Sequence, residues 1–170
     1  MPDTWFRDTA APRRRGAGAG RPLDAAAARV KTERLINVRD RSTKELADRL
    51  RQAGFSERIA QAELARARKA GLVDDERFCR LYVSGKAHLG WGRNRIVREI
   101  RRYGIELEQM EGYPEEFFDA DEELARACAC VRSFHTHSKN PTAACLRRLV
   151  NRGFPLSVAR QALSLVDGSP

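Results

Sequence analysis

A row of arginines on one predicted helix is the feature of this sequence best suited to chemistry. Apolar residues at helical spacing predict a helix from Arg93 to Tyr103, with about 100° of rotation per residue. Four arginines fall within roughly a third of its circumference, and its apolar residues lie opposite. These arginines are Arg95, Arg98, Arg101 and Arg102. Guanidinium groups bind phosphate and carboxylate oxygens through paired hydrogen bonds, so the row predicts a polyanion-binding surface.

Three neighbouring residues extend this surface. Lys86 ends the preceding predicted helix, Arg93 lies at the turn, and Trp91 between them offers a ring for stacking. The predicted site for nucleic acid or an acidic protein surface therefore comprises Lys86, Trp91, Arg93, Arg95, Arg98, Arg101 and Arg102. The helix lacks the short polar side chains of a base-reading helix, so we expect contact with the nucleic-acid backbone and little sequence readout. The alternative interpretation is a solvated face that keeps the protein soluble.

A second group of side chains has the chemistry of a zinc site without its spacing. Cys128 and Cys130 are followed by His135, His137 and Cys145. The first two cysteines fall in a helical pattern, where two residues correspond to about 200° of rotation, so their sulfurs diverge. Zinc-binding cysteine pairs normally occupy a turn. We therefore predict no metal site, and we expect reduced thiols that are buried as small apolar groups.

The sequence offers no clear catalytic group. Asp74 and Asp75 are adjacent carboxylates, but they precede a predicted helix, where capping is the expected role. The glycines at 16, 18 and 20 lack the preceding strand and following Lys-Ser or Lys-Thr of a phosphate loop. The acids from Glu106 to Glu123 lack the alternating ligands of a calcium loop. We expect no catalytic residue, no cofactor and no metal.

The distribution of charge favours a polyanionic partner. The chain has 170 residues, with 32 Lys and Arg against 23 Asp and Glu, and a net charge of +9. Residues 30–105 and 124–170 carry excess positive charge, whereas residues 106–123 hold nine acids and no base. Such an excess suits nucleic acid. Because no long apolar run or apolar leader is visible, we expect a cytoplasmic protein that does not enter a membrane. We also expect it to be a monomer.

The periodicity of the chain from Asp24 onward is helical, with hardly any strand alternation. Ser42 to Glu45 forms a capping box, in which the Ser hydroxyl accepts from an amide and Glu45 reaches back. Leu46 and Leu50 follow at helical spacing, and the helix is expected to end at Gly54. The pattern predicts an all-α protein.

An internal repeat of about 50 residues organises these helices. Gly54, Gly104 and Gly153 align, each followed by Phe or Ile and preceded by an apolar residue four positions earlier. We predict three tandem copies of a three-helix repeat that stack into an elongated, curved array. The predicted divisions are a disordered basic arm at 1–22, repeat 1 at 23–72, repeat 2 at 75–112, an acidic linker at 113–120 and repeat 3 at 121–166.

The motifs of these repeats resemble those of the RecX regulators of the RecA recombinase. The resemblance covers roughly residues 29–166, and its clearest part is the run Gly71-Leu-Val-Asp-Asp-Glu-Arg-Phe78. Further matching features are Tyr82, the Gly90-Trp-Gly92 turn, Ile96, Ile100, Gly104-Ile105, the Val38–Leu46 run and Leu149-Val-Asn-Arg-Gly-Phe154. One departure is Met110-Glu-Gly-Tyr-Pro114, which interrupts the last helix of repeat 2 because Gly and Pro break helices.

This resemblance implies a non-catalytic regulator that lies in the groove of the RecA filament on DNA. Members of the family inhibit the ATPase and strand-exchange activities of the recombinase, which modulates recombinational DNA repair. The basic row would then face DNA or acidic filament surfaces. Two other hypotheses stay open, namely a sequence-independent DNA-binding helical-repeat protein with no recombinase partner and a helical scaffold for an unrelated protein.

Overall fold

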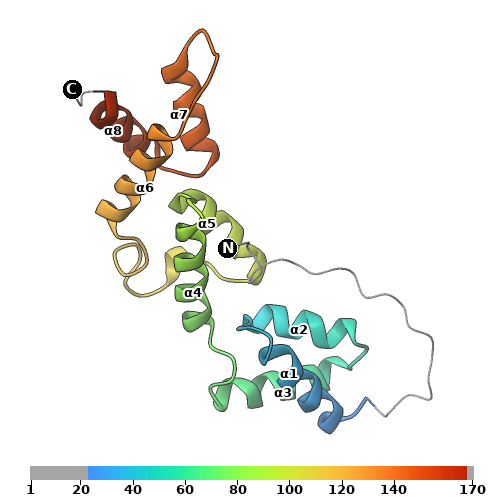
Figure 1. Ribbon diagram of the computed structural model, residues 1–170. Helices are drawn as coiled ribbons and strands as arrows, with labels where there is room; N and C mark the ends of the chain where they lie inside the picture. The colour runs from blue at the N-terminus through green and yellow to red at the C-terminus, as the bar shows by residue number, and fades with distance from the viewer. Residues whose placement is uncertain (1–22, 168–170) are drawn as a thin grey trace. The chain divides into compact units, whose positions relative to one another are not determined.

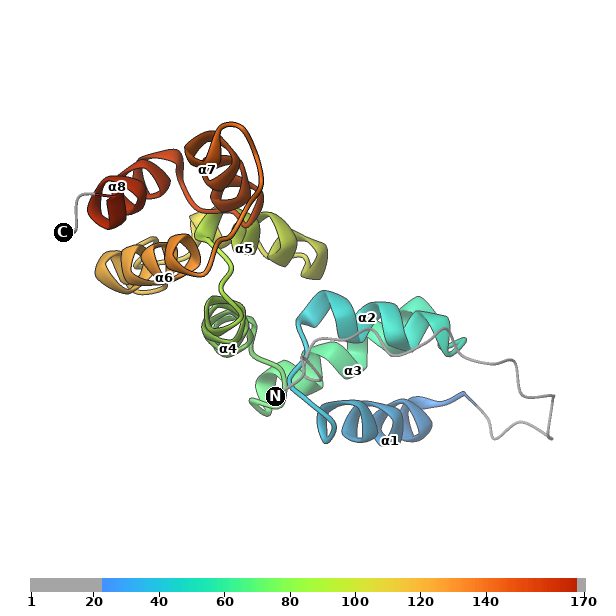
Figure 2. The same cartoon turned by 45° about the horizontal axis from the view of Figure 1, so that its top comes forward.

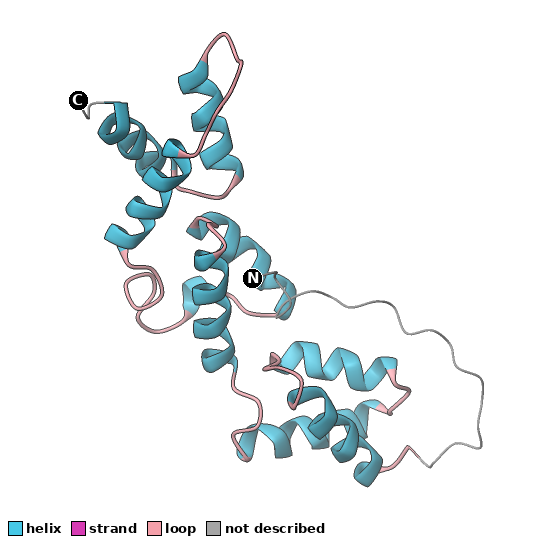
Figure 3. Cartoon of the chain, in the orientation of Figure 1, coloured by secondary structure: helices cyan, strands magenta, loops and turns pink. Residues whose placement is uncertain are grey.

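The computed structural model describes residues 23–167, and within this range helices joined by loops and turns are its only regular elements (Figures 1 and 3). The predicted all-α fold is confirmed. The predicted arm at 1–22 lies outside the described residues. The chain divides into two compact units, one ending at Asp74 and the other beginning at Asp75. No helix between residues 23 and 167 is both long and apolar enough to cross a membrane.

The first unit contains α1 (Ala25–Ile36), α2 (Thr43–Gln52) and α3 (Glu57–Lys69). A short polar side chain caps each helix: Asp24 accepts from the Ala27 amide, Ser42 from the Glu45 amide, and Ser56 from the Ile59 amide, at 2.8, 3.1 and 3.4 Å. These caps satisfy amides that have no partner within the helix, which fixes where each helix starts.

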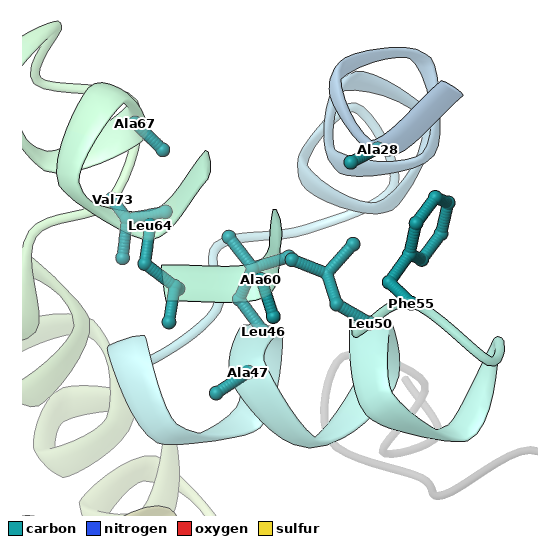
Figure 4. Packing of buried hydrophobic residues seen from close by; sticks show 9 residues of the cluster. All are labelled: Ala28, Leu46, Ala47, Leu50, Phe55, Ala60, Leu64, Ala67 and Val73. Carbon is teal, nitrogen blue, oxygen red and sulfur yellow. The ribbon is translucent and has the colours of Figure 1, made fainter. Parts of the chain in front are cut away.

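The three helices of the first unit close around one apolar core (Figure 4). Leu46 and Leu50, predicted to share a helix face, are both fully buried, and the chain reverses at Gly54 with a left-handed φ of +91°. The buried cluster consists of Ala28, Leu46, Ala47, Leu50, Phe55, Ala60, Leu64, Ala67 and Val73. Two of the buried residues that α3 contributes are alanines, Ala60 and Ala67.

The second unit begins with α4 (Asp75–His88) and α5 (Arg93–Ile100). The predicted helix from 93 to 103 tightens over its last three residues into the 3-10 helix η1 (Arg101–Tyr103) before Gly104. Phe78, Tyr82 and Tyr103 form an aromatic cluster with ring centroids 5.2 to 5.9 Å apart. This cluster holds α4 against the end of α5.

The third helical element of the predicted repeat 2 is a single 3-10 turn, η2 (Leu107–Gln109). The chain then turns through Gly112, whose φ of +76° is left-handed, and through Pro114, so the expected helix does not continue. Leu107 and Phe118 are buried and anchor this segment on the second unit.

The remaining helices are α6 (Ala120–Arg132), α7 (Pro141–Asn151) and α8 (Leu156–Asp167), with α6 beside α8 (Figure 2). Cys128, Cys130 and Cys145 are buried in their core, as predicted for small apolar groups. The core comprises Ala127, Cys128, Cys130, Cys145, Leu149, Phe154, Ala159, Ala162 and Leu163.

Candidate functional site

The indole of Trp91 organises the basic residues at the junction of α4 and α5. The guanidinium carbon of Arg95 lies 3.6 Å from the Trp91 ring centroid, and Lys86 Nζ lies 4.7 Å from it. The negative face of an aromatic ring attracts cations. Trp91 therefore stacks within the protein itself, where it fixes the position of Arg95.

The structure places Lys86 differently from the sequence prediction. Only 4% of this residue is exposed, because its alkyl chain lies within the helix packing and its ammonium group also approaches Tyr82, at 5.5 Å from the ring centroid. Lys86 does not reach the surface from this position. Its ammonium group faces the rings of Trp91 and Tyr82.

The other arginines of the predicted site differ in their partners. Arg101 pairs with Glu106 and Glu108, at 3.0 and 2.5 Å, and Arg102 pairs with Glu99 at 2.9 Å. Exposed ion pairs of this kind contribute only about 0–1 kcal/mol, so an incoming polyanion can replace them at little cost. Arg98 is exposed and, among residues 23–167, forms no ion pair.

The acidic stretch accounts for several of these pairs. Besides Glu106 and Glu108, Glu116 pairs with Arg80 of α4 at 2.8 Å, and its hydrogen bond to Arg80 raises the pKa of that guanidinium. Glu123 pairs with Arg93 at 3.4 Å. The acids from Glu106 to Glu123 thus neutralise part of the basic surface that precedes them.

Glu123 also connects α6 to the start of α5. Its side chain is 1% exposed, and Oε1 accepts the backbone N–H of Arg93 at 2.8 Å. Gly92, the N-cap of α5, has no side chain to accept this hydrogen bond. A carboxylate at a helix N-terminus stabilises both the free amides and the helix dipole. Glu123 is therefore a cap supplied from a distant helix.

Backbone hydrogen bonds join the same end of α5 to the end of α7. The Gly92 N–H donates to the Arg152 carbonyl and the Asn94 N–H to the Gly153 carbonyl, both at 2.9 Å. A Cβ on Gly153 would lie 2.3 Å from Arg95 Cβ, and a Cβ on Gly92 would lie 2.2 Å from the backbone nitrogen of Phe154. Only glycines allow this approach, which brings Arg95 and Arg152 together.

An open pocket of about 510 Å³ lies where α5 meets α7. Its lining is Arg95, Arg147, Arg148, Arg152, Ala144 and Asn151. We call the four arginines the arginine pocket. No carboxylate lines it, and none of its arginines forms an ion pair in the part of the chain that the structure describes. Its electrostatic character is that of an anion site.

Sequence reasoning missed three members of this pocket. Arg147, Arg148 and Arg152 stand about 50 residues after Arg95, and only the contact through Gly153 brings the two helices together. The positive charge of residues 124–170 was the available signal. This net charge does not show where the arginines lie in space, because arginines on any face of α7 would give the same net charge.

Known proteins are similar to this chain in both sequence and fold. Family models for the first and second three-helix domains of RecX match residues 28–66 and 74–111. The regulatory protein RecX of Amycolatopsis mediterranei is 30% identical over 131 residues, which cover 74% of each chain. This chain belongs to the RecX family of regulatory proteins. The RecX of Mycolicibacterium vanbaalenii is 36% identical over 106 residues, which cover 62% of this chain and 57% of that protein.

The solved structures confirm the helical-repeat fold of this RecX-family chain. The crystal structure of RecX from Lactobacillus salivarius superposes with a TM-score of 0.75 at 16% identity, over 85% of this chain and 97% of that one. The first matched RecX domain ends at residue 66 and the second at residue 111. Arg147, Arg148 and Arg152 therefore lie beyond both of them.

Proposed function

We propose that this RecX-family chain regulates recombinational DNA repair by binding the RecA filament on DNA and inhibiting its ATPase and strand-exchange activities. Membership in the RecX family of regulatory proteins is the observation that carries the proposal. The exposed arginines on and after α5 support it, because a filament on DNA presents phosphates together with carboxylates. The action requires no bond to be made or broken by this chain.

The predicted site residues take different parts in this proposal. Arg98, Arg101 and Arg102 are exposed and contact the filament or DNA directly, the last two after exchanging their carboxylate partners. Arg95 is half-buried against Trp91 and presents its guanidinium from a fixed position. Lys86 supports Trp91, while Arg93 keeps the N-terminus of α5 in place through Glu123. Phosphate contacts of this kind give affinity without sequence readout.

The test is a titration of this protein into RecA on single-stranded DNA while ATP hydrolysis is followed. We expect hydrolysis to fall at amounts stoichiometric with RecA, and excess free duplex DNA to relieve the effect only in part. Unchanged hydrolysis would contradict the proposal. Complete relief by free DNA, with salt-sensitive binding to bare DNA, would favour the alternative of a DNA-binding protein with no recombinase partner.

Substitution of the exposed row tests which surface is used. Replacing the exposed arginines Arg98, Arg101 and Arg102 together with Ala should weaken filament binding and leave the helical circular dichroism signal and the melting temperature nearly unchanged. The side chains of Arg98, Arg101 and Arg102 point into solvent, so the fold does not depend on them. Intact nucleic-acid and filament binding in this variant would favour the scaffold hypothesis.

A further inference from the structure

We infer that the arginine pocket between α5 and α7 is a binding site for the phosphate groups of a nucleic-acid backbone. The inference rests on the proposed function and deepens it, because it names a second surface, contributed mainly by repeat 3, through which this chain holds DNA. None of Arg147, Arg148 and Arg152 belongs to the row of arginines recognised in the sequence.

The first argument is the absence of compensating charge. Several arginines elsewhere in the described range have carboxylate partners, as Arg51 has in Glu57 and Arg66 has in Glu63, both at 2.7 Å. The four guanidinium groups of the arginine pocket share one open pocket without a single acid on its lining. Like charges gathered in this way repel one another, and an anion placed among them removes that repulsion.

The second argument is that half of the pocket is already held in place. Arg95 is stacked on Trp91, with 3.6 Å between guanidinium carbon and ring centroid, and Arg148 lies 5.3 Å from the Phe134 ring centroid. Side chains fixed before binding lose less conformational freedom when a ligand arrives. These aromatic contacts restrict the arginines and leave their N–H groups available as donors.

The third argument selects the ligand. The lining offers guanidinium donors and the amide of Asn151, with Ala144 as its one apolar residue. These donors match the oxygens of a phosphate group. A nucleic-acid strand carries one phosphate charge per nucleotide, and about 3.4 Å of helix axis separates them on each strand of duplex DNA. Neighbouring phosphates can thus reach several arginines together, whereas a single protein carboxylate would leave most of them uncompensated.

The test uses the double variant Arg147→Gln with Arg148→Gln, because both side chains are exposed and serve no backbone contact that the structure shows. The matched control is Arg132→Gln with Arg160→Gln, which removes the same charge from exposed positions of α6 and α8 outside the pocket. Binding of fluorescein-labelled oligo(dT) is measured by anisotropy at several salt concentrations, with no recombinase present.

We expect the pocket variant to bind oligo(dT) at least about tenfold more weakly, with the slope of log K against log salt reduced by about 1.4 for two lost phosphate contacts. The control should keep most of the affinity and the slope. Equal binding by the pocket variant and the wild type would overturn the inference. So would equal losses in both variants, because net charge alone would then explain the effect.

A local readout comes from Trp91, which stacks on Arg95 inside the pocket. The chain has two tryptophans, so Trp5→Phe leaves Trp91 as the only indole. We expect oligo(dT) to change its fluorescence in this background and the change to disappear when the two glutamines are added. Tripolyphosphate that bound more tightly than oligo(dT) at equal phosphate concentration would overturn the assignment to a nucleic-acid backbone.

The inference and the proposed function fail in different experiments. If the pocket variant loses oligo(dT) binding while the wild type leaves ATP hydrolysis by RecA unchanged, the inference about the pocket is supported and the proposed recombinase partner is refuted. If the variant keeps oligo(dT) binding but loses the filament, the pocket binds an acidic protein surface, which overturns the inference and leaves the proposed function standing.

Discussion

Replacing Glu123 with Ala should destabilise the second unit more than any other change of a single acid in the acidic stretch from Glu106 to Glu123. Glu123 is 1% exposed, and its Oε1 accepts the Arg93 backbone N–H at 2.8 Å. The N-cap of α5 is a glycine with no side chain to take over this hydrogen bond. The truncation therefore leaves an amide of α5 without its acceptor.

The magnitude follows from the contacts. A hydrogen bond to a charged group contributes about 1.5–3 kcal/mol to the free energy of unfolding. The ion pair between Oε2 and Arg93 Nε, at 3.4 Å, adds little, because one third of the Arg93 side chain is exposed to screening solvent. Release of a buried carboxylate from its desolvation offsets part of the loss. We expect Glu123→Ala to cost about 2–3 kcal/mol, and Glu123→Gln about 1 kcal/mol because the amide oxygen still accepts.

The assay is thermal and urea unfolding followed by Trp91 fluorescence in a Trp5→Phe background, because Trp91 reports on the second unit. For a unit of about 100 residues, a loss of 2–3 kcal/mol lowers the melting temperature by roughly 10 °C or more. The matched control is Glu122→Ala. Its carboxylate is exposed and lies 3.5 Å from Arg126, so it should cost less than about 0.5 kcal/mol. Equal effects of the two substitutions would refute the assignment of Glu123 as the cap of α5.

Three further outcomes are expected. Gly153→Ala should cost about 2–5 kcal/mol of unfolding free energy, because its φ is +92° and the added Cβ would lie 2.3 Å from a side-chain carbon of α5. Gly71→Ala, which has open space around it at a φ of +65°, should cost about 1–2 kcal/mol. Similar urea midpoints for the two variants would contradict this expectation. Leu50→Ala should cost about 2–5 kcal/mol by urea unfolding, because Leu50 is fully buried in the core of the first unit, and a loss below 1 kcal/mol would remove it from that core. Hydrogen bonding to Arg51 lowers the pKa of Glu57 to about 2, so the pair stabilises the fold at neutral pH and loses that contribution as the pH falls toward 2. An NMR titration should show that the pKa of Glu57 rises in the Arg51→Gln variant. An unchanged pKa would disprove Arg51 as the cause.

The local elements of the fold were predictable because their signals lie within one or two helical turns. Ser42 accepts from the Glu45 amide as the capping motif predicts, and Leu46 and Leu50 are buried together. Gly54 has the left-handed φ of +91° that its place after a helix requires. In each case the residues that interact are at most four positions apart or repeat at the helical period, so their spacing in the sequence determines their relative positions on the helix.

The predicted binding row stays a prediction as a site, and the structure adds the charge pairing that the sequence could not give. The sequence placed Arg98, Arg101 and Arg102 on the outside of the chain, and all three are exposed. It gave no account of Glu106, which pairs with Arg101, because composition counts charges without pairing them. It also placed Lys86 on the surface, whereas the packing around Trp91 buries this lysine.

The sequence by itself determined that this chain is a basic, all-helical repeat protein of the RecX type, since helix caps, apolar periods and glycine stops act over a few residues. Only the tertiary structure decided which charges remain uncompensated. The close approach of Gly153 to Arg95 brings α7 to α5, and Glu123 reaches from α6 to cap the same helix. Charge pairing depends on distances between side chains far apart in the sequence, and those distances exist only once the helices have packed.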